Sequence, residues 1–143
     1  MKKFLTGFLG LICILGTSLE AQQVQHGTAA AAIVPGASMV RMQPFSAVPN
    51  YIRFQEGKEP AAQELETILR AFMAAPEDFS LQLIGTETDR LGQVHYRYQQ
   101  VYRGIPVAMG TYIAHTRNGQ LLSANGELFD QLEAAAPILT EAQ

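Results

Sequence analysis

The chain has 143 residues, a length that suits one domain better than two. Its formal net charge is −3, from 10 Lys and Arg against 13 Asp and Glu, so it lacks the basic footprint of a nucleic-acid-binding protein. The one cysteine, Cys13, lies in an N-terminal apolar run that we expect to be removed, which excludes disulfides and a thiol nucleophile from the mature chain.

Residues 1–21 have the pattern of a secretory signal peptide. Lys2 and Lys3 give a positive start, residues 4–15 form an almost unbroken apolar run, and small or polar residues follow. The run is shorter than the roughly 20 apolar residues that span a bilayer, so we predict no membrane association after cleavage. Cleavage is expected after Ala21, with Ser18 as the alternative, and the mature chain would be secreted or periplasmic.

Residues 22–50 are predicted to be a mobile, low-complexity leader. They contain several glutamines, the alanine run 29–32 and three prolines. A helix over the alanines would be marginal on its own. No element of the expected fold is therefore assigned to this segment.

Residues 51–130 are predicted to form the folded domain, which opens with a short edge strand at 51–54. A helix follows, because Pro60 fits the first turn of a helix and Pro76 stops one. Between these prolines, apolar residues recur at the i, i+4, i+7, i+8 spacing of one buried face. They are Ala61, Leu65, Ile68, Leu69, Phe72 and Met73.

From Phe79 onward the apolar period changes to two, which indicates strands. Turns are expected at Gly85–Gly92, Gly104–Pro106, Asn118–Gly119 and Asn125–Gly126. The prediction is an α+β fold in which one amphipathic helix packs on a four-stranded antiparallel meander. The helix side chains from Leu65 to Met73 should pack against Leu83, Val94, Tyr96 and Tyr98.

The last residues indicate that the protein continues. Thr140 and Gln143 have the spacing of a capping box, so the chain stops on the first turn of an apparent helix. Residues 131–143 are accordingly predicted to be a linker and the start of a following domain.

Patterns for catalysis or metal binding are absent from the sequence. The three histidines form no His-Glu-x-x-His pair. His95 and His115 lie on neighbouring expected strands and can meet as a cross-strand pair, but a metal site wants a third ligand, so half-exposed sheet histidines are favoured. Ser80 and Ser123 have no base and acid nearby in the pattern. By elimination, the segment is a binding or folding module.

The stretch from His95 to Val107, His-Tyr-Arg-Tyr-Gln-Gln-Val-Tyr-Arg-Gly-Ile-Pro-Val, resembles the fungalysin/thermolysin propeptide domain. The lead-in 88–92, His115, Asn118–Gly119 and Asn125–Gly126 continue the resemblance in order, over about residues 50–128. It implies an N-terminal pro-segment of a secreted zinc metalloendopeptidase, without active-site residues of its own. Residues 137–143 look like the opening of the PepSY-type domain that usually follows.

The resemblance further implies a partner, the cognate metalloprotease catalytic domain in cis. The segment would act as its intramolecular inhibitor and folding assistant, and zinc is expected only in that catalytic domain. The alternatives are a free-standing secreted protease inhibitor and an extracellular module that binds a peptide or glycan through the stripe of Tyr96, Tyr98 and Tyr102. Core packing is the favoured role of that stripe.

Strand alternation predicts where a partner would dock. Side chains that point away from the helix-covered face stay available to another chain. The expected docking residues on this polar face and its turns are His95, Arg97, Gln99, Arg103 and Gly104.

Overall fold

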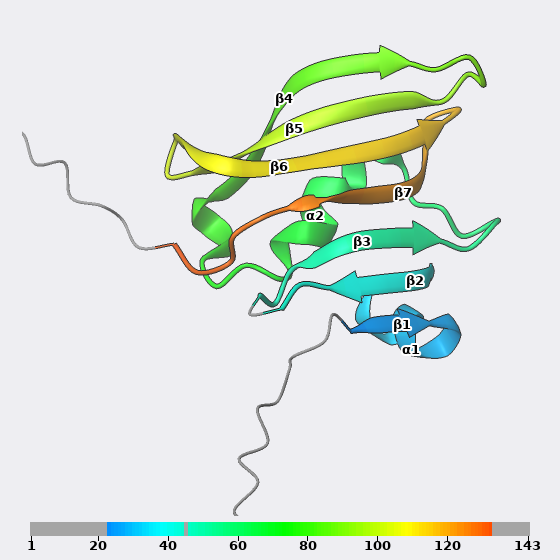
Figure 1. The fold of residues 1–143 in the computed structure, drawn as a ribbon, viewed down its shortest axis with the longest axis horizontal. Coiled ribbons are helices and arrows are strands. Elements are labelled where there is room, and N and C mark those ends of the chain that lie inside the picture. The colour runs from blue at the N-terminus through cyan, green and yellow to red at the C-terminus, as the bar shows by residue number, and fades with distance from the viewer. Residues whose placement is uncertain (1–22, 45, 133–143) are drawn as a thin grey trace, which may run out of the picture.

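A computed structural model describes residues 23–44 and 46–132, and within them seven strands form one antiparallel sheet (Figure 1). The strands are β1 (Val24–His26), β2 (Ala37–Met42), β3 (Pro49–Phe54), β4 (Phe79–Thr88), β5 (Val94–Tyr102), β6 (Ile105–Arg117) and β7 (Gln120–Glu127). Their order across the sheet is β1-β2-β3-β7-β6-β5-β4. Two meanders, β1–β3 and β4–β7, are thus joined side by side through the pairing of β3 with β7.

Short helices cover one face of the sheet. They are α1 (Gly27–Ile33), the 3₁₀ turn η1 (Ala62–Glu64), α2 (Leu65–Arg70) and the 3₁₀ turn η2 (Pro76–Asp78). In Figure 1, α2 crosses behind the strands. Ala30 from α1 and Leu65 and Leu69 from α2 belong to the same buried cluster, so both helices pack on the same face.

The core lies between these helices and the central strands. One row of it runs across four strands at matched register, through Val40, Ile52, Ala124 and Ala114. All four side chains are fully buried. Tyr112 is also fully buried, and its hydroxyl donates a hydrogen bond to the carbonyl of Pro49 at 2.8 Å, which ties β6 to β3.

The α+β class and the antiparallel sheet are confirmed, but the predicted strand number and helix length are wrong. The sheet has seven strands, four of which form the expected meander. The helix covers only Leu65–Arg70, because the residues before it pair with the β6–β7 turn: Ala62 N–H donates to the Gly119 carbonyl and Leu121 N–H to that of Pro60. At the other end, Ala75 precedes a proline and has a non-helical backbone, with φ −125° and ψ 78°.

The expectation of a leader without regular structure over 22–50 is also wrong. Residues 24–42 form β1, α1 and β2, and β3 begins at Pro49. The alanine helix is held by packing, since Ala30 and Val34 are buried in the common core. As a result β3 is an inner strand rather than an edge strand.

Two smaller expectations fail within the sheet. Asn125 and Gly126 lie inside β7 and form no turn. A Cβ at Gly126 would lie 2.2 Å from the Thr111 carbonyl oxygen, so the glycine is required by close strand approach. In the predicted core, Leu83 is half-exposed and Val94 lies outside the buried cluster, whereas Tyr96 and Tyr98 pack against it as expected. The predicted signal peptide and the segment 133–143 lie outside the described residues.

Candidate functional site

The sheet face opposite the helices carries two rows of side chains at matched register. The first row, from β1 to β4, is His26, Met39, Arg53, Ser123, His115, His95 and Glu87. The second is Val24, Arg41, Tyr51, Asn125, Ile113, Arg97 and Gly85. We call these two rows the open face.

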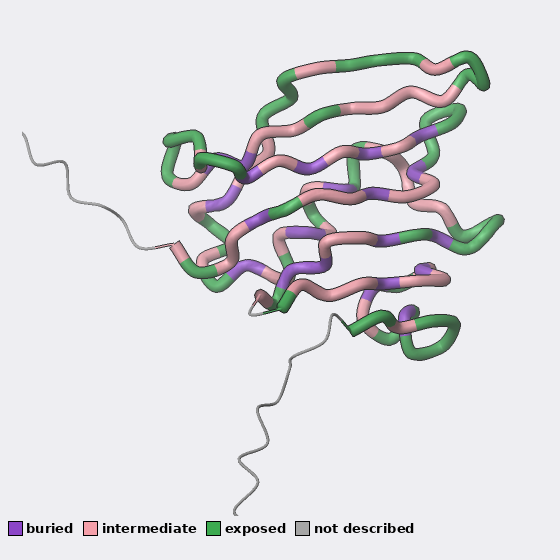
Figure 2. The backbone as a smooth tube through the Cα atoms, in the orientation of Figure 1, coloured by how far each residue is buried: buried purple, intermediate pink, exposed green. Residues whose placement is uncertain are grey.

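None of the residues in these rows is buried. Their covered-face neighbours on the central strands are fully buried, and the two classes alternate along β6 in Figure 2. The contrast arises because successive side chains of a strand point to opposite faces. A sheet face of seven strands is therefore available to another molecule.

The open face is cationic although the chain as a whole is acidic. Arg41, Arg53 and Arg97 lie on it, with Glu87 at its β4 edge. Arg41 is fixed locally: its Nε donates to Asn50 Oδ1 at 2.8 Å and its guanidinium lies 5.5 Å from the centre of the Tyr51 ring. Arg53 and Arg97 are exposed, and neither forms an ion pair with a carboxylate of the described residues.

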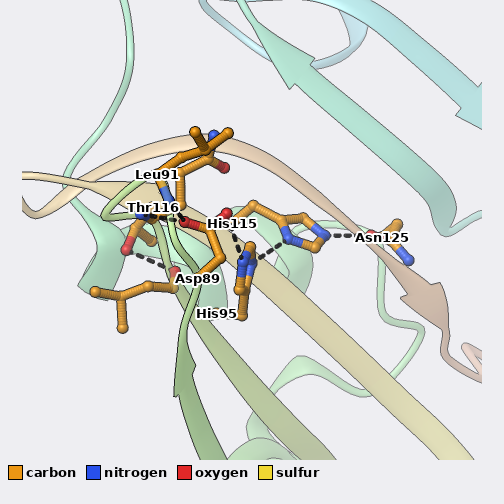
Figure 3. A network of polar contacts seen from close by, with 8 residues as sticks. Asp89, Leu91, His95, His115, Thr116 and Asn125 are labelled. Atoms are coloured by element: carbon orange, nitrogen blue, oxygen red, sulfur yellow. Dashed lines mark hydrogen bonds and ion pairs between the residues drawn. The ribbon is translucent and has the colours of Figure 1, made fainter.

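At the centre of the first row, four polar side chains form a continuous chain (Figure 3). Asp89 Oδ2 lies 3.4 Å from His95 Nε2, the two Nδ1 atoms of His95 and His115 lie 2.7 Å apart, and His115 Nε2 lies 2.6 Å from Asn125 Oδ1. The rings meet edge to face, with centroids 4.9 Å apart. The cross-strand histidine pair is thus present.

Asp89 is held as an anion beside this pair. The backbone N–H of Gln93 lowers the pKa of Asp89 below its usual range, and the Leu91 N–H and His95 add to the effect. Both N–H groups donate to Asp89 Oδ1, at 2.9 and 2.8 Å. The tight turn between β4 and β5 therefore fixes Asp89 and leaves its second oxygen for His95.

The structure brings only some of the predicted docking residues together. His95 and Arg97 lie on the open face, where they line a shallow hollow with Glu87, Ile113 and His115. Gln99 is engaged internally: its amide donates to the carbonyls of Val107 at 2.6 Å and Gly110 at 2.9 Å.

Arg103 and Gly104 lie apart from the others, in the turn between β5 and β6. Arg103 Nε donates to Asp78 Oδ2 at 2.7 Å, which raises the pKa of Arg103 and directs it toward η2. Arg103 follows Arg97 by six residues and lies in the turn after β5, so roughly 20 Å of extended chain separates them at about 3.3 Å per residue. One compact patch cannot include both.

Sequence reasoning missed four residues of the open face and its polar chain. Arg41 falls in the expected leader and Arg53 in the expected edge strand, while Asp89 and Asn125 fall in expected turns. For Arg41 a signal was available: Met39 and Arg41 alternate with Val40, which is buried. The contact between Asn125 and His115 required the β6–β7 register, which the sequence pattern did not specify.

Other kinds of site have little support in the part of the chain that the structure describes. There, no three His, Cys, Asp or Glu side chains are close enough to hold a metal ion. Among the same residues no helix has the length and apolarity to cross a membrane. Tyr96 and Tyr98 pack against the core, which is the expected role of the tyrosine stripe.

Comparison with known proteins identifies the second meander. Residues 79–128, which coincide with β4–β7, match the model of the Fungalysin/Thermolysin Propeptide Motif. The resemblance noted at residues 95–107 is thereby confirmed. No solved structure matches the chain.

Curated relatives match a stretch of similar length, 53 residues. Proteins named thermolysin from Alicyclobacillus acidocaldarius subsp. acidocaldarius and from Bacillus caldolyticus are each 45% identical to it over 53 residues. Thermostable neutral protease NprT of Geobacillus stearothermophilus is 40% identical over 53 residues. The matched segment covers 37% of this chain and 10% of each relative, so the similarity concerns a small part of those proteins.

Proposed function

We propose that this chain is the N-terminal pro-segment of a secreted thermolysin-like zinc metalloendopeptidase, which it inhibits and helps to fold in cis. The observation that carries the proposal is the propeptide motif over residues 79–128, which spans the whole β4–β7 meander. The proposal includes export by a signal peptide at 1–21 and a following domain that starts within 131–143. The segment itself performs no hydrolysis, and zinc belongs to the catalytic domain.

The open face is the proposed docking surface for the catalytic domain. No described residue covers it, whereas the opposite face is occupied by the chain's own helices. Its cations Arg53 and Arg97 have no carboxylate partner among the described residues, so an acidic surface on the catalytic domain would complement them. Linkage in one chain raises the effective concentration of such a partner, so modest contacts suffice to keep a cleft covered.

Inhibition of thermolysin in trans tests the proposal. The chain from Gln22 to Gln143 should slow hydrolysis of a peptide substrate by purified thermolysin. Arg97→Ala should raise the inhibition constant about thirtyfold, because a docking charge that loses its partner typically costs about 2 kcal/mol.

Arg103→Ala is the matched control, since it removes the same charge from the turn that follows β5, away from the open face. Its ion pair with Asp78 is exposed and should contribute little to folding. Equal inhibition by the two folded variants would place docking elsewhere, and absence of inhibition by the unmodified chain at high micromolar concentration would contradict the pro-segment role.

A further inference from the structure

Strand β6 contains a bulge close to the turn that joins it to β5. Gln99 pairs with Thr111 and Val101 pairs with Pro106, so residues 107–110 of β6 stand opposite one residue of β5. An ordinary bulge places two residues opposite one and leaves a single residue without a partner in the ladder. This bulge is therefore larger than strand pairing requires, and it gives part of β6 a shape of its own.

Met109 has an unusual backbone conformation within this bulge. Its φ is +63°, in the left-handed region that glycine and asparagine adopt far more readily than methionine. Its side chain is 79% exposed, more than any other large apolar side chain of the described residues. A methionine at this position thus strains the backbone and adds nothing to the core. Strain that folding does not need is a common sign of a functional residue.

The Gln99 side chain holds the bulge in its shape. Its amide nitrogen donates to the carbonyls of Val107 at 2.6 Å and Gly110 at 2.9 Å. Both partners are carbonyl oxygens and can only accept, so the nitrogen of the amide is the atom that faces them. The two hydrogen bonds fix the bulge at both of its ends. Met109 lies between them and is presented on a well-supported backbone.

Met109 also borders a hollow on the open face. The hollow is lined by polar side chains as well, among them Arg41, Thr111, Asn125 and Glu127. Arg41 and Asn125 belong to the second row of the open face, so the hollow is continuous with the proposed docking surface. An apolar side chain with polar groups around it is the arrangement found at the energetically important part of protein interfaces, where methionine is enriched.

We propose that Met109 is an apolar anchor of the docking surface and inserts into an apolar recess on the catalytic domain, an inference that rests on the proposed function. The fixed bulge lowers the entropy lost on binding, because the backbone is already ordered. The unbranched, polarizable side chain of methionine adapts to a recess of irregular shape. Burial of this side chain in the complex offsets the strain that the free chain carries.

Thermal unfolding of the chain from Gln22 to Gln143 tests whether the methionine serves folding. Met109→Gly accepts a positive φ without steric cost, so the midpoint should rise by about 2–4 °C. Met109→Asn also tolerates the left-handed region, so its midpoint should be at least that of the unmodified chain. A lower midpoint for both variants would overturn the proposal, because Met109 would then stabilise the fold itself.

Inhibition of thermolysin by the same chains tests the anchor. Met109→Gly and Met109→Asn should each raise the inhibition constant about tenfold, as expected when an interface anchor is removed. Met109→Leu keeps an apolar side chain of similar volume and should stay within about threefold of the unmodified chain. Leu91→Asn is the matched control, because Leu91 is 74% exposed in the turn between β4 and β5 and does not line the hollow. Its inhibition constant should be unchanged.

The failure of the anchor and the failure of the proposed function give different results. If the unmodified chain inhibits thermolysin and Met109→Gly inhibits it equally well, the anchor is overturned and the pro-segment role stands. If the unmodified chain does not inhibit at high micromolar concentration, the proposed function and the anchor are both contradicted. Gel filtration gives a further check: a dimer of the unmodified chain that Met109→Gly converts to a monomer would overturn the proposal, since Met109 would then contact a second copy.

Discussion

Gln100 shows how a single residue can break the pattern of its strand for a structural reason. It lies on the helix-covered face of β5 among tyrosines, and its side chain is almost fully buried. Its amide donates to the Phe129 carbonyl at 2.7 Å and accepts from the Phe129 N–H at 3.0 Å. The Gln100 side chain therefore takes the place of a neighbouring strand for the segment that follows β7. It satisfies the N–H and C=O groups of Phe129, which would be costly to bury without partners.

Gly110 makes room for this amide, which leads to a prediction. A Cβ at Gly110 would lie 2.8 Å from Gln100 Oε1 and 2.9 Å from its Cβ, so Gly110→Ala forces Gln100 to move. We expect a loss of about 1–3 kcal/mol in the free energy of unfolding, measured by urea denaturation. Gly85→Ala is the control, because its Cβ would meet only Arg97 at an ordinary 3.8 Å. Equal losses for the two variants would contradict the account.

Asp89 gives a prediction about acid stability. Its pKa is lowered below its usual range, first by the Gln93 N–H and then by the Leu91 N–H and His95. A lowered carboxylate pKa contributes stability that is present above the unfolded pKa and is lost as pH falls through the folded pKa. Asp89→Asn keeps an oxygen acceptor for both N–H groups but does not titrate.

The stability advantage of the unmodified chain over Asp89→Asn should therefore shrink below about pH 4. Urea denaturation at a series of pH values measures it. A difference that stays constant from neutral pH to about pH 2 would show that the Asp89 charge contributes nothing.

At the scale of elements, the sequence predicts the second meander well and the first poorly. Strands β5 and β6 are long and keep a period of two, and Asn118–Gly119 forms the turn between β6 and β7 as expected. In contrast, β1 has three residues and α1 seven, too few for a periodic signal. The segment of α1 is held by burial of Ala30 and Val34 in the core, and β1 is held by its pairing with β2, so both depend on tertiary contacts rather than on a local pattern. For the same reason, the predicted site does not include Arg41, Arg53 and Asn125, which the long-range strand pairings place on the open face.

The helix α2 provides the element-scale prediction. Leu69 is fully buried in the core cluster, whereas Thr67 on the same helix is exposed. Leu69→Asp should unfold the domain, because a buried unpaired carboxylate costs several kcal/mol and a domain of this size has roughly 5 kcal/mol in reserve. Thr67→Asp should leave the thermal transition nearly unchanged. A melting curve for Leu69→Asp that matches the unmodified chain would mean that α2 does not pack on the sheet.

At the scale of the whole molecule, the open face depends on both meanders. Both of its rows begin on β1, pass through β2, β3, β7, β6 and β5, and end on β4. Arg41 comes from the first meander and Arg97 from the second, which is where the family match lies. A boundary at residue 51, as predicted for the domain, falls inside β3. The proposed docking surface and the core row therefore both include residues that precede the propeptide motif.

Removal of the first two strands tests this dependence. A chain that begins at Tyr51 lacks the buried Ala30, Val34 and Val40 and leaves Ile52 uncovered at a new sheet edge. Complete burial of a valine or leucine side chain contributes about 1.5–3 kcal/mol, so the loss should exceed a reserve of roughly 5 kcal/mol. An exposed apolar edge also invites association between chains.

We therefore expect no cooperative thermal transition by circular dichroism and a broad, early-eluting profile in gel filtration for the chain from Tyr51 to Gln143. The control begins at Gly27 and loses only β1, whose three residues are not buried, so it should keep the transition with a modest decrease in midpoint. Removal of β1 alone leaves Val40 packed on Ile52, which makes the comparison specific for α1 and β2. If the chain from Tyr51 melts cooperatively at the temperature of the full mature chain, the second meander is an independent folding unit and the first contributes only surface.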